Sequence, residues 1–130
     1  MKPVPPAVVP ALGITRLVIG TGMIIGPAGL GKALGLPEAE AKRAGWIARL
    51  AGAREIAIGL GTLDAWRSGR PVDGWVAAQG ISDASDAIAF AAISIQGKVS
   101  PVRGWGMSLF ALSGAVSEGL TAVALRRGSR

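Results

Sequence analysis

Residues 44–66 read AGWIARLAGAREIAIGLGTLDAW, an apolar stretch that carries Arg54 and Glu55 near its middle. A helix needs about 20 residues to cross about 30 Å of hydrocarbon, at a rise of about 1.5 Å per residue. This stretch is long enough to do so. The sequence therefore predicts a membrane-spanning helix with charged side chains inside it.

Three further apolar stretches have a similar length, and they occupy residues 11–31, 74–96 and 102–125. Of the 130 residues, 50% are hydrophobic and 17% are charged, and the mean hydropathy is +0.46. The links between the stretches are short, which makes consecutive helices antiparallel. We therefore predict an all-α fold over residues 11–130, an integral membrane four-helix bundle with up-down topology.

The first ten residues contain four prolines, and we expect residues 1–10 to form an extended leader that is not helical. A secretory signal is the alternative for the first apolar stretch. That stretch is longer than the roughly 7–15 residues of a signal core and has no clean cleavage site. We expect it to remain as a membrane span, with Pro27 kinking the helix or ending it early.

Tryptophan occurs at the ends of the predicted spans and at none of their centres, as Trp46, Trp66, Trp75 and Trp105. Amphipathic rings gather at membrane interfaces, whereas a soluble core takes tryptophan at its middle. Their placement favours a membrane protein. The alternative is a soluble helical bundle rich in Ala and Gly, which the charges inside the stretches keep open.

Small residues are expected to let the helices pack closely. The faces we single out are Gly22-x-x-x-Gly26 in the first span, Gly52 and Gly59 in the second, and Gly114, Ser117 and Thr121 in the fourth.

The formal net charge of +6 comes from basic residues that lie mainly in the links and the tail. No aromatic residues alternate with them, so they indicate anchoring at anionic lipid headgroups rather than binding to nucleic acid. With both termini on one side, that side carries six basic residues against five, which favours cytoplasmic termini in a cell inner membrane. The six are Lys2, Arg67, Arg70, Arg126, Arg127 and Arg130, and the five are Lys32, Lys42, Arg43, Lys98 and Arg103.

Ionisable residues also fall inside the predicted spans, and each costs about 2.5–3.5 kcal/mol when it lies unpaired near the bilayer centre. We therefore expect them to face one another inside the bundle. Because acids outnumber arginines by four to two, we expect a protonated carboxyl or a bound cation among them. The six residues are Arg16, Arg54, Glu55, Asp83, Asp86 and Glu118.

Depth along the helices indicates which of these charges meet. Arg54 and Asp86 both lie roughly 12–15 Å below the same surface, which predicts an ion pair between them. Gln79, Asp83 and Asp86 follow one another at one-turn spacing and form a polar stripe on the third span.

The remaining charges are expected elsewhere in the bundle. Arg16 and Glu118 lie in the other leaflet by the same reasoning, where we expect them to pair. Glu55 follows Arg54 by about 100° around the helix and is expected to point to a different neighbour. Asp64 lies near the end of its span and is expected to be solvated or locally paired.

The chain contains no cysteine and no histidine. Thiol nucleophiles, imidazole bases and the usual zinc and haem ligands are therefore excluded, and we expect no metal and no cofactor. Carboxylate, arginine and hydroxyl chemistry remains.

The run Arg49-x-x-Gly52-x-Arg54-Glu55-x-x-x-Gly59, followed by an acidic pair in the third span, resembles the small four-span membrane proteins of the DoxX-like group. This resemblance implies the four-span fold. It also implies an association with respiratory or redox membrane complexes, although many members have no assigned role. Without His and Cys, any haem-ligating or thiol-relay function would need a partner subunit.

Three functions fit these observations. The first is a non-enzymatic membrane subunit or small-ligand-binding module. In it the polar residues either clamp the helices together or bind an apolar small molecule. We expect such a protein to form a homo-oligomer or to belong to a larger membrane complex. The candidate binding residues are Arg16, Arg54, Gln79, Asp83, Asp86 and Glu118. The second is an intramembrane acid-base enzyme acting on an epoxide, a terpenoid or a quinone. The third is a proton-coupled transporter of lipophilic compounds.

In the enzyme hypothesis the catalytic residues are Arg54, Glu55, Asp83, Asp86 and Glu118. Arg54 orients Asp86 or Asp83, and a protonated Glu118 or Glu55 supplies the acid.

Overall fold

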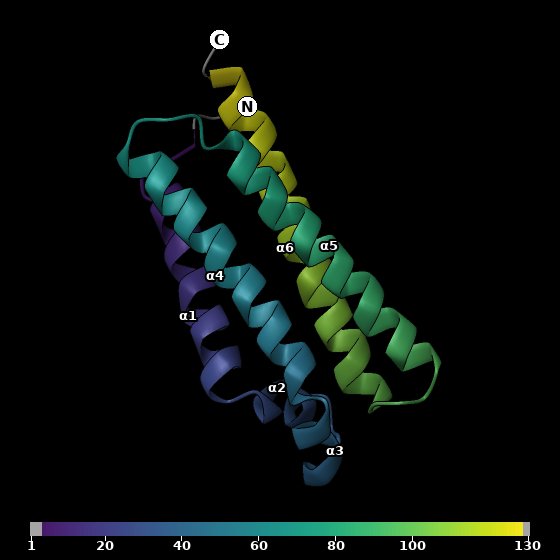
Figure 1. The fold of residues 1–130 in the computed structure, drawn as a ribbon. Coiled ribbons are helices and arrows are strands. Elements are labelled where there is room, and N and C mark those ends of the chain that lie inside the picture. Colours follow the sequence, from purple (N-terminus) through teal and green to yellow (C-terminus); the bar gives the residue numbers. More distant parts are fainter. Residues whose placement is uncertain (1–3, 129–130) are drawn as a thin grey trace.

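The computed structural model describes residues 4–128, and within them the chain forms six α-helices and no strand (Figure 1). The four long helices are α1 (Val8–Ile25), α4 (Gly45–Arg67), α5 (Asp73–Ile95) and α6 (Pro101–Gly128). Two short helices, α2 (Ala28–Ala33) and α3 (Glu38–Arg43), lie between α1 and α4. The predicted all-α class is confirmed.

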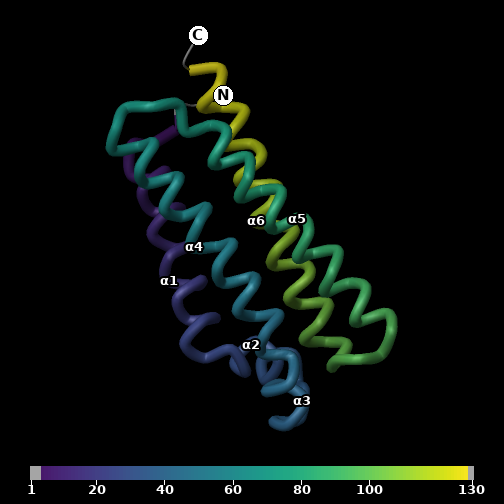
Figure 2. The backbone as a smooth tube through the Cα atoms, viewed as in Figure 1, coloured from purple at the N-terminus to yellow at the C-terminus, as the bar shows by residue number. Residues whose placement is uncertain are grey.

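Consecutive long helices run in opposite directions, and they form two closely packed pairs (Figures 1 and 2). α1 packs along α4, and α5 packs along α6, with few backbone contacts between the two pairs. Both ends of the described chain lie at one end of the molecule, and α2 and α3 lie at the other. Contacts between the two pairs are therefore made mainly by side chains.

The prediction for the start of the chain is wrong in part, because α1 begins at Val8 inside the expected extended leader. Pro10 lies in the first turn of α1, where a backbone nitrogen has no intrahelical partner to lose. Residues 1–3 of the leader lie outside the described residues. At the other end, α1 stops at Ile25, and Pro27 precedes α2, so the predicted early end is confirmed.

The other three long helices match the predicted stretches to within a few residues. Gly35, Gly69 and Gly97 reverse the chain with φ angles of +85°, +64° and +66°, which are accessible to glycine at no steric cost. Pro101 begins α6.

Glycines bring α1 and α4 together backbone to backbone. A Cβ at Gly20 would lie 2.6 Å from the carbonyl oxygen of Gly52, and a Cβ at Gly59 would lie 2.8 Å from that of Gly13. Each helix contributes two glycines seven residues apart, which is two turns along one face. The prediction of close packing at Gly52 and Gly59 is confirmed.

Other small-residue faces do not behave as predicted. A Cβ at Gly22 would meet nothing within 4 Å, and a Cβ at Gly26 would meet only the carbonyl oxygen of Gly22. Gly22 lies on a different face of α1 from Gly13 and Gly20, which meet α4, and Gly26 follows the end of α1. On α6, Gly114 lies against the carboxylate of Asp83, whereas Ser117 is exposed.

Within residues 4–128, α1 and α6 are long and apolar enough to cross a membrane. α4 and α5 do not meet the same criterion. They carry four of the six charges that the sequence places inside spans, Arg54, Glu55, Asp83 and Asp86. At the helix ends, Asp64 pairs with Arg70 as the sequence predicts.

Candidate functional site

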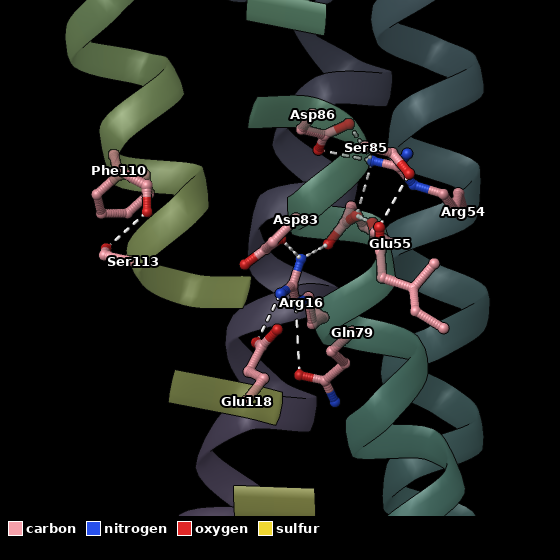
Figure 3. Close-up of polar contacts among 12 residues, drawn as sticks. Arg16, Arg54, Glu55, Gln79, Asp83, Ser85, Asp86, Phe110, Ser113 and Glu118 are labelled. Carbon is pink, nitrogen blue, oxygen red and sulfur yellow. Dashed lines mark hydrogen bonds and ion pairs between the residues drawn. The ribbon is translucent and has the colours of Figure 1, made fainter. Parts of the chain in front are cut away.

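Arg16 of α1 lies at the centre of a polar network to which every long helix contributes (Figure 3). Its Nη1 atom is 2.6 Å from both Glu55 Oε2 of α4 and Asp83 Oδ1 of α5. Its Nη2 atom is 2.6 Å from Glu118 Oε1 of α6. One guanidinium group thus joins the two helix pairs, and the predicted Arg16–Glu118 contact is confirmed.

The stripe on α5 faces this network. Arg16 Nε donates to Gln79 Oε1 at 3.4 Å, and the Gln79 amide donates to Thr62 Oγ1 of α4 at 2.8 Å. Gln79 is completely buried. Both ends of its amide have partners, which fixes the side chain beneath Arg16.

Arg54 of α4 forms the second part of the network. Its Nη2 atom donates to both carboxylate oxygens of Asp86, at 2.9 and 2.7 Å, so the predicted ion pair is confirmed. The same atom donates to Glu55 Oε1 at 3.2 Å, and the Ser82 hydroxyl donates to that oxygen at 2.9 Å. Sequence reasoning missed Ser82 and Thr62. The position of Ser82 one turn before Asp86 was the available signal.

The predicted division into two clusters at different depths is wrong. Glu55 binds Arg16 through Oε2 and Arg54 through Oε1, so a single carboxylate joins both parts. Arginine and glutamate side chains are long enough to cover a helical turn, and residue depth alone therefore does not separate their charged ends. Glu55 does reach a neighbour on another helix, although it also keeps its contact with Arg54.

The network contains more carboxyl groups than guanidinium groups. Among residues 4–128, Glu55, Asp83, Asp86 and Glu118 face two cations, Arg16 and Arg54, which leaves a formal excess of two acids when all are ionised. In this part of the chain, Glu118 Oε2 and Arg54 Nε are buried without a hydrogen-bond partner. An incompletely satisfied buried network is electrostatically costly, because the surroundings solvate its charges poorly.

A cavity of about 440 Å³ lies beside the network, between the two helix pairs. Arg16, Glu55, Asp83 and Asp86 line one part of it. The rest is lined mainly by apolar side chains, including Ile19, Met23, Leu30, Phe90, Met107 and Phe110. Glu118 is not among the lining residues.

α2 forms part of the wall of this cavity. Leu30 and Ala33 of α2 belong to its lining, and the segment after them is tied to the start of α6. The Ser100 amide donates to the Leu34 carbonyl at 3.1 Å, and Arg103 Nη1 donates to the Lys32 carbonyl at 3.3 Å. The early end of α1 thus lets the chain fold across the cavity.

No group of three or more acidic side chains within residues 4–128 has an arrangement that could hold a metal ion. Glu55, Asp83 and Glu118 converge on the Arg16 guanidinium, and Asp86 pairs with Arg54. The arrangement is suited to hydrogen bonding and proton exchange.

No known protein family, no curated protein and no solved structure matches this chain. The resemblance to the DoxX-like group stays a prediction that rests on the motif in α4 and the acids of α5.

Proposed function

We propose that this chain is an integral membrane protein whose four long helices all cross the bilayer, and that its central cavity binds a small, mainly apolar molecule. The observation that carries the ligand-binding part is the cavity of about 440 Å³ with charged side chains on one part of an otherwise apolar wall. Small-molecule sites are typically concave, mostly apolar and about 300–1,000 Å³ in volume, with a few polar groups that fix orientation.

The distribution of polarity supports a membrane setting. Side chains such as Ile25, Ile88 and Ile95 are more than 70% exposed, whereas Arg16 and Glu55 are less than 10% exposed. Soluble proteins rarely expose large contiguous apolar patches and rarely bury this many charges. In a bilayer the apolar outer face contacts lipid, and the charges face the bundle interior.

The tryptophans support the same setting. Trp46 and Trp66 lie near the two ends of α4, 20 residues and thus about 30 Å apart, which is the thickness of the hydrocarbon layer. Trp75 at the start of α5 and Trp105 near the start of α6 lie at opposite ends of the molecule. All four rings are between 39% and 62% exposed, as interfacial rings should be.

The buried network explains how α4 and α5 can cross despite their charges. Arg54 and Asp86 pair with each other, and Glu55 and Asp83 both accept from Arg16. Paired charges that face the bundle interior cost much less than charges exposed to lipid.

Single cysteines test the membrane topology, because the chain has none of its own. We expect Ser68→Cys and Lys98→Cys to react with a membrane-impermeant maleimide from opposite sides of sealed vesicles. Leu109→Cys, in the outer face of α6, should react only after denaturation. Equal labelling of all three from one side would contradict the proposal.

Gly22 offers a test of the cavity. It lines the cavity, and a Cβ there would meet nothing within 4 Å, so Gly22→Phe should fill the space without displacing a helix. Gly106→Phe is the matched control, because a Cβ at Gly106 also meets open space but lies outside the cavity lining.

The probes are three molecules with one benzyl stem and different heads: benzyltrimethylammonium, neopentylbenzene and phenylmethanesulfonate. We expect at least one to bind the wild-type protein in phosphatidylcholine nanodiscs at one site, measured by calorimetry against empty nanodiscs. Gly22→Phe should abolish that binding, and Gly106→Phe should retain it. Binding of none of the three, or unchanged binding by Gly22→Phe, would refute the proposed function.

A further inference from the structure

We infer that the ligand of this cavity is an apolar organic cation with a single positive charge, and that its binding displaces one proton from the carboxyl network. This inference rests on the proposed function and names the chemical class of the ligand. It follows from charge, exposure and the lining of the cavity taken together.

The carboxyl groups at the cavity and its network outnumber the guanidinium groups. The ionisable groups facing the cavity and its network are Arg16 from α1, Arg54 and Glu55 from α4, Asp83 and Asp86 from α5, and Glu118 from α6. Both terminal nitrogens of Arg16 already bind carboxylates, and Arg54 Nη2 binds Asp86 and Glu55. With all four carboxyls ionised, the site has two negative charges in excess, and an anionic ligand would increase that excess.

The carboxylate side chains differ in how far they are exposed. The Asp86 side chain is 33% exposed and the Asp83 side chain is 15% exposed, whereas Glu55 is 3% exposed. Both aspartates line the cavity. A ligand inside it therefore meets the negative ends of Asp83 and Asp86 more readily than the deeply buried glutamate.

The Asp83 carboxylate lies in a confined space between Arg16 and α6. Its Oδ1 atom binds Arg16, and its Oδ2 atom lies against Gly114, where a Cβ would overlap it. Only glycine at this position allows α6 to approach the carboxylate so closely. The Asp83 carboxylate is thus fixed in direction, with one oxygen committed to the network.

The apolar part of the cavity lining also favours a cation. Phe90 and the largely exposed Phe110 contribute aromatic rings to the lining, and Met23 and Met107 contribute polarisable thioethers. Aromatic faces attract ammonium groups through the ring quadrupole, most strongly where water is excluded, and methionine adapts to irregular apolar shapes. A trimethylammonium or protonated tertiary amine head with an apolar stem matches both parts of the cavity.

The release of a proton follows from the same excess of carboxyl groups. Two uncompensated negative charges in apolar surroundings are costly, so the empty network holds protons on its excess carboxyls. When a cation enters, one carboxylic acid O–H bond breaks, the proton leaves to water, and the carboxylate pairs with the ligand. The total charge of the site is unchanged by the exchange.

The same three benzyl probes separate this inference from the proposed function. We expect benzyltrimethylammonium to bind at least tenfold more tightly than the uncharged neopentylbenzene, and phenylmethanesulfonate not to bind. Calorimetry in buffers of different ionisation enthalpy should give about one proton released per cation. Affinity should then rise about tenfold per pH unit across the range in which the proton is lost.

Asp86→Asn should weaken cation binding at least tenfold and reduce the proton release. Asp64→Asn is the matched control, since Asp64 lies at the far end of α4 and pairs with Arg70 outside the cavity. It should bind the cation as the wild type does. The probe series on the wild-type protein keeps the test independent of how Asp86→Asn folds.

Each of the other outcomes of these binding experiments refutes a stated part of the inference. Equal binding of the cation and neopentylbenzene would refute the charge selectivity and leave the ligand-binding function standing. Cation binding without proton release would refute the exchange. Binding of none of the three probes would refute the inference and the proposed function together.

Discussion

Arg16→Met removes the group that joins all four long helices while keeping a long side chain that fills the same space. It leaves Glu55, Asp83 and Glu118 without their 2.6 Å partner. These side chains are 3%, 15% and 6% exposed, so water does little to replace the guanidinium. Removing one partner of a buried ion pair costs about 3–5 kcal/mol. For a chain of this length we expect a fall in Tm of roughly 10–20 °C.

The assay is thermal unfolding of the purified protein, followed by the fluorescence of its four tryptophans. Arg67→Met is the control, because Arg67 is an exposed residue at the end of α4, and its Tm should stay within about 2 °C of the wild type. Since the cost lies in stranded carboxylates, adding Glu118→Gln to Arg16→Met should recover part of the loss. A fall of less than about 4 °C for Arg16→Met would refute the central role of Arg16.

Three further predictions concern other parts of the structure. Arg54→Leu and Asp86→Leu should each lower the free energy of unfolding by roughly 1–3 kcal/mol, and the double variant should lose less than the sum; additive losses would contradict the pair. Gly52→Leu should lower the free energy of unfolding by about 1–3 kcal/mol, because its Cβ would lie 2.7 Å from a carbonyl oxygen of α1. An unchanged Tm would contradict that packing. The Lys42 ammonium holds the pKa of Glu38 below its ordinary value, so this contact stabilises the fold above the unfolded-state pKa and is lost as the pH falls through the lowered one. NMR titration should show that low pKa, and Lys42→Gln should raise it toward the ordinary value, with Lys32 still lowering it.

Much of the fold was predictable because long apolar stretches bounded by Gly and Pro leave few choices of helix. The structure places α4, α5 and α6 within a few residues of the predicted stretches. The start of α1 differs from the prediction because proline excludes a helix only beyond its first turn. Pro10 is tolerated there since it lies in the first turn, and only the position of the first turn decides this.

The members of the polar network were also predictable. Charged residues inside apolar stretches must find partners, and this requirement alone identifies all six ionisable residues, with Gln79 added by its one-turn spacing from Asp83. Their connections were only partly predictable. Arg54–Asp86 and Arg16–Glu118 follow from depth, but the double role of Glu55 does not, because it depends on how far each side chain reaches and how each helix is rotated.

The sequence by itself thus determined the four long helices, their order and the residues that have to lie inside. The tertiary structure alone decided that Gly20 lies against Gly52, that α2 folds across one end, and that a cavity lies between Arg16 and Phe110. The physical reason is that helix periodicity fixes which residues share a face, whereas the rotation and separation of two helices depend on the contacts that all of them make at once.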